Sequence, residues 1–126
     1  MLNFRQFEAG PDPFGRKFKV LFKWLQTAIS IRHSDTVDVK FVLVNEDEGR
    51  TEKTIALPHA DLLQVSQETQ RRMDDSWCAR IAALHLQRLV ETGEDMEKDL
   101  VTVLPADLRR YAGEVSRMEK SAVGAR

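Results

Sequence analysis

The segment IRHSDTVDVKF, residues 31–41, places His33, Ser34 and Asp35 side by side. These are the side-chain types of a hydrolytic triad, in which a histidine takes the proton of a serine nucleophile and an aspartate orients the histidine. The members of such triads come together from distant parts of a chain, whereas neighbours at a turn point apart. No G-x-S-x-G sequence surrounds Ser34. The triple therefore indicates a turn, and we do not expect serine-hydrolase chemistry.

A second group that could do chemistry joins His33 to His59, with Asp35 and Asp61 each two residues further along. If both histidines follow strands that run in the same direction with one strand between them, they lie at one edge of a sheet, about 10 Å apart. Two imidazoles and two carboxylates there could bind a divalent metal or exchange protons. We call these four residues the histidine rim. The simpler interpretation, which we favour, is that all four are ordinary polar loop residues.

The remaining candidate residues give weaker evidence for a functional site. Cys78 and His85 are seven residues apart, so on a helix they lie about 10.5 Å apart along its axis, too far to bind one zinc ion together. We expect both to pack in the core. The acidic segment GEDMEKD, residues 93–99, lacks the spacing of a calcium loop. No HExxH, CxxC or glycine-rich phosphate loop occurs, and we expect no metal and no cofactor.

The elements that must position these residues change period near the middle of the chain. In residues 17–26 the large apolar side chains alternate with lysines, which is typical of a half-buried strand: Phe18, Val20, Phe22 and Trp24. The apolar positions then change parity, so we expect a β-bulge within residues 25–28. Residues 37–43 and 51–57 predict two further strands, separated by the polar loop NEDEGR at 45–50.

Helical spacing of the apolar residues begins after Pro58. It predicts helices over about 59–70, 75–92 and 105–118, with a brief strand or an extended link at 100–104. Asp74 and Asp75 are candidate caps for the second helix, and Gly93 is the residue expected to end it. Trp77 should face the sheet.

This order of elements predicts an α+β fold with an N-terminal antiparallel β-meander of three to four strands packed against two to three C-terminal helices. A chain of 126 residues fits one domain, which we place at residues 1–118. Residues 1–16 form an aromatic arm, and residues 119–126 a flexible C-terminal tail. Four large side chains should build the interface between the layers: Trp24, Phe41, Trp77 and Leu84.

Composition limits the class of protein. With 42% hydrophobic and 31% charged residues the chain is of ordinary globular type. No apolar run approaches the roughly 18 residues of a membrane span, and the first residues lack the apolar region of a secretory signal. A lone cysteine agrees with a reducing compartment, so we expect a cytoplasmic protein with no membrane contact. The pI of about 6.3 disfavours nucleic acid as a partner.

Three aromatic residues of the arm, Phe4, Phe7 and Phe14, lie outside any clear strand. Such an arm either covers the core of its own domain or docks on a partner. Because no motif for chemistry stands out, we expect a noncatalytic protein-interaction or structural domain whose partner is another protein or a second copy of this chain. The alternative is a small hydrolase or metal-dependent enzyme that uses the histidine rim. No small-molecule ligand can be assigned from the sequence.

Overall fold

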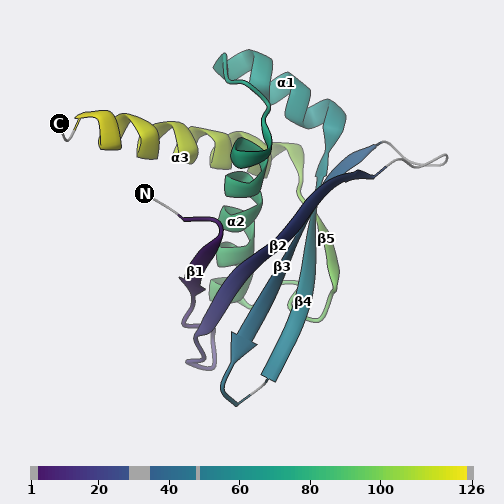
Figure 1. Ribbon diagram of the computed structural model, residues 1–126, viewed down its shortest axis with the longest axis vertical. Coiled ribbons are helices and arrows are strands. Elements are labelled where there is room, and N and C mark those ends of the chain that lie inside the picture. The colour runs from purple at the N-terminus through teal and green to yellow at the C-terminus, as the bar shows by residue number, and fades with distance from the viewer. Residues whose placement is uncertain (1–2, 29–34, 48, 125–126) are drawn as a thin grey trace.

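The computed structural model describes residues 3–28, 35–47 and 49–124 of the chain (Figure 1). The elements, in chain order, are β1 (Gln6–Ala9), β2 (Phe18–Ala28), β3 (Thr36–Asn45), β4 (Gly49–Pro58), α1 (His59–Thr69), α2 (Asp75–Thr92), β5 (Leu100–Thr102) and α3 (Pro105–Gly124). The expected α+β fold is confirmed, with a mostly antiparallel sheet followed by three helices.

The sheet has the strand order β1-β2-β3-β4-β5. Strands β1 to β4 form an antiparallel meander, and β5 pairs in parallel with β4 from Thr54↔Leu100 to Ala56↔Thr102. Two parts of this sheet extend the sequence prediction. β1 lies inside the aromatic arm, where we predicted no strand. Of the segment at 100–104, predicted as a brief strand or an extended link, three residues pair as a strand.

The β-bulge of β2 lies earlier than the sequence predicted. The register with β3 shifts between Phe22 and Trp24, so Lys23 is the extra residue, rather than one within 25–28. Trp24 therefore faces away from the helices, where the Lys40 ammonium lies 5.2 Å from its ring centroid. The expectation that Trp24 contributes to the interface between the sheet and the helices was wrong. The alternation of Phe18, Val20 and Phe22 was continued to Trp24, whereas the bulge at Lys23 turns Trp24 to the other face of the sheet.

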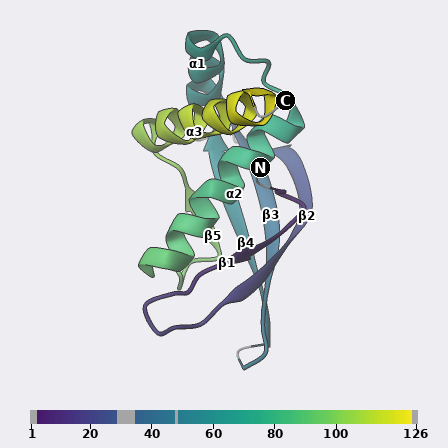
Figure 2. The ribbon, with the colours of Figure 1, turned by 90° about the vertical axis from the view of Figure 1, so that its left-hand side faces the viewer.

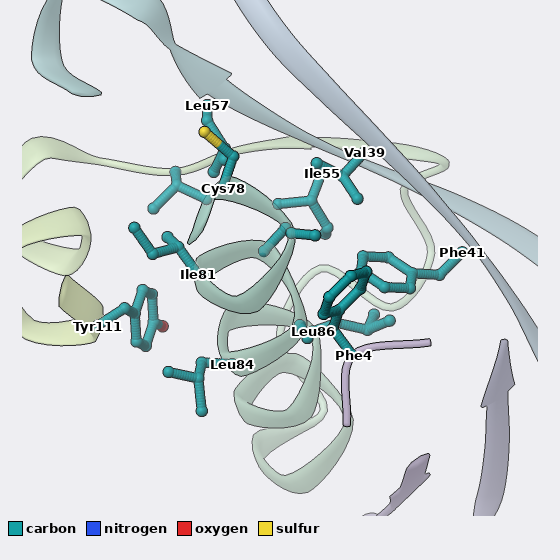
Figure 3. Close-up of a cluster of buried hydrophobic side chains, with 14 of the residues drawn as sticks. Phe4, Val39, Phe41, Ile55, Leu57, Cys78, Ile81, Leu84, Leu86 and Tyr111 are labelled. Atoms are coloured by element: carbon teal, nitrogen blue, oxygen red, sulfur yellow. The ribbon is translucent and has the colours of Figure 1, made fainter. Parts of the chain in front are cut away.

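The core lies between one face of the sheet and α2. Val39 and Phe41 from β3 and Ile55 from β4 are fully buried there, and Ile81 and Leu86 from α2 pack in the same cluster (Figure 3). Of the four residues expected at this interface, Phe41, Trp77 and Leu84 are buried, but Leu84 lies on the side of α2 toward Tyr111 of α3 rather than toward the sheet (Figure 3). Figure 2 shows α2 crossing this face, with α1 and α3 toward one end of the sheet.

The ends of α2 follow the predicted local chemistry. The Asp74 carboxylate accepts a hydrogen bond of 2.8 Å from the Trp77 backbone N–H, which caps the first turn. Gly93 ends the helix with φ 76°, a left-handed conformation that glycine adopts without strain. A Cβ at Gly93 would lie only 3.1 Å from a carbon of Pro13, so the β1–β2 loop packs closely against the end of α2.

The last helix is longer than predicted. Its helical backbone continues to Gly124 rather than ending near Met118. Glu119 forms ion pairs with Arg71 and Arg80, so the first turn beyond Met118 is tied to α2 and to the segment before it. The flexibility expected of residues 119–126 stays a prediction. None of the helices in the described part of the chain combines the length and apolar character needed to cross a membrane.

Candidate functional site

Part of the histidine rim is present at one end of the sheet. The His59 backbone N–H donates a 2.9 Å hydrogen bond to the Asp35 backbone carbonyl, which follows from the pairing of Thr36 with Pro58. The Asp35 residue is exposed, while His59 and Asp61 are half-buried. His33 and Ser34 lie outside the described residues, so the rim as a site stays a prediction. Within residues 3–28, 35–47 and 49–124, no group of three or more His, Cys, Asp or Glu residues could hold a metal ion.

Cys78 lies in the core, as predicted. It is buried beside Leu57 under the sheet (Figure 3). Burial, with smaller effects from Asp75 and Asp74, raises the pKa of the Cys78 thiol to about 12. A thiol that keeps its proton is a poor nucleophile and a poor metal ligand. The structure therefore gives Cys78 a packing role.

His85 also packs in the core, as predicted, and belongs to a small polar network between α2 and α3. Its Nδ1 atom lies 2.8 Å from the Tyr111 hydroxyl oxygen, and Arg88 reaches the same oxygen at 3.5 Å and the Asp107 carboxylate at 2.9 Å. The Arg88 side chain can only donate to the Tyr111 oxygen, so the phenol hydrogen is free to be donated to Nδ1 of His85. An Nδ1 atom that accepts a hydrogen bond carries no proton, which favours the neutral imidazole. Burial lowers the pKa of His85, Asp107 raises it, and Arg88 lowers it further; the net direction is down. The network joins the two helices.

The acidic segment at 93–99 binds the ammonium group of Lys53 from the same chain. The Lys53 side chain is buried, and its ammonium donates hydrogen bonds to the backbone carbonyls of Asp95, Met96 and Lys98, at 3.1 Å and 3.2 Å for the first two. Burial lowers the pKa of Lys53, against the opposing effect of Asp99 and its acidic neighbours. These carbonyls are therefore ligands of a lysine, which makes the segment a structural loop.

The aromatic arm divides between the core and the surface. Phe4 is buried, with its ring centroid 5.4 Å from that of Phe22 in an edge-on contact. Phe7 makes a similar contact with Phe41 at 6.0 Å. Phe14 is different, because 83% of its surface is exposed. Of the three candidates for interaction, two cover the domain's own core and one points into solvent.

The loop that carries Phe14, residues 10–17, is built around the buried carboxylate of Asp12. One oxygen accepts from the backbone N–H groups of Phe14 and Arg16, at 3.0 Å and 2.7 Å, and the other accepts from the Arg16 side chain at 2.7 Å. Burial raises the pKa of Asp12, but the bonds from Arg16 and Phe14 outweigh it and lower the pKa overall. At Gly10, whose φ is 112°, a Cβ would lie 2.7 Å from the Arg16 carbonyl oxygen, so only glycine fits.

Arg16 connects this loop to the aromatic side chains. Its guanidinium carbon lies 5.2 Å from the ring centroid of Phe14 and 5.9 Å from that of Phe18. A cation over an aromatic face contributes about 0.5–1 kcal/mol at an exposed site. Together with the Asp12 bonds and the Pro13 contact at Gly93, these interactions hold the loop in one conformation with the Phe14 ring outside the core.

Phe14 stands at one side of an open cleft of about 910 Å³ between the β1–β2 loop and the turn that joins β3 to β4. We call it the Phe14 cleft. It combines apolar and charged side chains, and its lining is formed by Gln6, Phe7, Glu8, Phe14, Gly15, Arg16, Lys17, Phe18, Lys19, Val44, Asn45, Glu46 and Asp47. The β1–β2 loop and the β3–β4 turn that border the cleft lie at the opposite end of the sheet from the start of α1 at His59 (Figure 1).

The sequence named Phe14 but missed the residue that positions it. Asp12 is buried in a segment we interpreted only as an aromatic arm. The signal was present in GPDPFG, residues 10–15, since aspartate, proline and glycine in this density are typical of a turn with side-chain bonds to its own backbone. Which of the three phenylalanines would be exposed could not be seen before β1 was placed.

In comparison with known proteins, the chain matches no protein-family model, no curated protein and no solved structure.

Proposed function

We propose that this chain is a noncatalytic protein-interaction domain and that the Phe14 cleft is its contact surface. The observation that carries the proposal is the exposed Phe14 ring, held outside the core by a loop whose conformation is already set. A large apolar side chain gains about 1.5–3 kcal/mol when it is fully buried, so an ordered, exposed phenylalanine is a favourable anchor for a partner. A pre-ordered loop also loses less conformational entropy on binding.

The lining of the cleft supports a protein partner. Aromatic residues are enriched at the centres of protein interfaces, with charged residues around them. Besides Phe14, the cleft is lined by the basic residues Lys17 and Lys19 and by the acidic residues Glu46 and Asp47. This mixture suits a partner surface with both signs of charge around an apolar centre. A second copy of this chain would also present both signs of charge around apolar residues.

The experiment compares three forms of the full chain: wild type, Phe14→Ser and Leu63→Ser. Leu63 is a matched control because it is an exposed apolar residue, 43% accessible, on α1 at the other end of the molecule. Each form is used for affinity capture from cell extract with quantitative mass spectrometry, and its solution mass is measured by light scattering. We expect proteins recovered with wild type and with Leu63→Ser to be lost with Phe14→Ser.

The outcomes separate the possibilities. If Phe14→Ser alone converts a dimer to a monomer, the partner is a second copy. If all three forms recover the same proteins and have the same mass, the Phe14 cleft is not the contact surface.

A further inference from the structure

The outer edge of β2 is paired over only part of its length. β1 pairs with it from Gln6↔Leu21 to Ala9↔Phe18, and the Phe22 backbone N–H donates to the Arg5 carbonyl at 3.0 Å. β2 then continues to Ala28, still paired with β3 on its other side. Among the described residues, no strand pairs with residues 24–28 on the side away from β3. Figure 1 shows β2 extending well beyond the start of β1.

Within the described part of the chain, the protection of this edge is limited to the bulge at Lys23 just before the unpaired segment. Its sequence, WLQTA, contains no charged residue and no proline. Natural edge strands are commonly blocked by lysine, proline or a covering element, because their free N–H and C=O groups otherwise bind another strand. Gln26 and Thr27 are exposed. The edge of β2 is therefore suited to accept an additional strand.

A cleft of about 770 Å³ lies next to this edge, between β2 and the start of α2. Its apolar lining is formed by Phe4, Phe22, Leu25, Met73 and Ala79, and its polar rim by Arg5, Arg72, Asp74, Asp75 and Ser76. Side chains of an extended chain alternate between the two faces of a sheet. A strand added beside Leu25 would therefore direct every second side chain toward this cleft.

We propose that β2 binds an extended peptide segment of a partner protein along residues 24–28, with an apolar side chain of that peptide in the cleft beside Leu25 and Met73. The unpaired backbone groups select an extended chain, and the apolar lining selects the side chain. A second copy of this chain fits less well. Its own β2 edge would bring Leu25, which already packs against its own core, and would leave the cleft without a free apolar side chain.

The proposal does not depend on the Phe14 cleft and has a separate test. A library of random nonapeptides displayed on phage is selected on the full chain, and the enriched sequences are synthesised with blocked ends. Their affinities are measured for wild type, Ser76→Arg and Gln87→Arg. Ser76 lines the cleft and is half-buried, so a long charged side chain there blocks it, whereas Gln87 is equally half-buried on α2 but outside this cleft. Hydrogen exchange of the backbone amides is followed with and without peptide.

We expect enriched peptides to alternate apolar and polar residues and to slow amide exchange in residues 24–28. Their affinity should fall at least about tenfold with Ser76→Arg and change less than about twofold with Gln87→Arg. Failure to enrich any peptide, equal binding by Ser76→Arg, or protection of a different segment would overturn the proposal. Protection of residues 24–28 that rises with protein concentration alone would replace the peptide with a second copy.

Discussion

Lys53 is a buried charge whose hydrogen-bond partners are all backbone carbonyls of one loop. We expect Lys53→Met to lower the free energy of unfolding by about 1–3 kcal/mol, because carbonyls that lose a charged donor are left partly unsatisfied. Lys19→Met is the control, since Lys19 is exposed on β2, and it should change this free energy by less than about 0.5 kcal/mol. Urea denaturation measures both. Equal stability of the two variants would mean that water replaces the ammonium without cost.

The His85 network predicts a dependence of stability on pH. The pKa of His85 is lowered in the folded state from an ordinary value of 6.5 by burial, and its charged neighbours on α2, α3 and the intervening segment are Asp107, Arg88, Asp95 and Glu94. Between the lowered pKa and about 6.5 the unfolded chain therefore binds more protons than the folded chain. Stability should fall as the pH drops below about 6.5 and should not depend on His85 above it.

His85→Gln tests this expectation, because glutamine can still reach a hydroxyl but does not titrate. We compare urea unfolding of wild type and variant at a series of pH values. The difference between the two curves should be constant above the ordinary pKa and should change below it. The Asp107 carboxyl, whose pKa is lowered by Arg88 and Arg110 against the raising effect of burial, titrates below 3.8 and does not interfere. A difference that stays constant over the whole range would contradict the neutral, buried imidazole.

At the scale of elements, the short strand β1 binds the arm to the rest of the sheet. It brings Phe4 and Phe7 over Phe22 and Phe41, in edge-on aromatic contacts. The first part of the arm, through β1, is therefore packed on the domain, whereas the loop between β1 and β2 exposes Phe14 to solvent. The two ends of one segment have different roles.

Phe4→Ala and Phe14→Ala test this division within the arm. We expect Phe4→Ala to lower the free energy of unfolding by about 3 kcal/mol, since it removes a buried ring, and Phe14→Ala to change it by less than about 0.5 kcal/mol. Thermal and urea denaturation of both variants provide the measurement. Similar losses in the two variants would show that Phe14 also supports the core.

At the scale of the whole molecule, the helices lie over one face of the sheet and leave the other without a helix in the described part of the chain (Figure 2). The open face is not simply polar. Val42 is only 4% exposed there, although none of the described helices covers it, and Lys40 lies over the ring of Trp24. Long charged side chains such as Lys23, which pairs with Glu52, shield apolar residues with their methylene groups. The two clefts proposed for binding lie at different places around this sheet.

Features that depend on neighbours in the chain were predictable from the sequence. Alternation in residues 37–43 predicted β3 and its buried face, and the spacing around Trp77 and Ile81 predicted α2 to within a residue at each end. Asp74 and Gly93 were recognisable as caps because capping involves only the adjacent turn. Core packing of Cys78 followed from the same periodicity. These features needed no knowledge of the sheet.

Features that depend on residues far apart in the chain could be seen only in the folded structure. Phe4 and Phe14 look alike in sequence, and only the pairing of β1 with β2 buries one and exposes the other. Lys53 finds its carbonyls more than forty residues away along the chain. The position of the bulge at Lys23 depends on the register with β3. The physical reason is common to all: burial and hydrogen bonding are settled by which segments meet across the sheet, and periodicity along one segment carries no information about its partner.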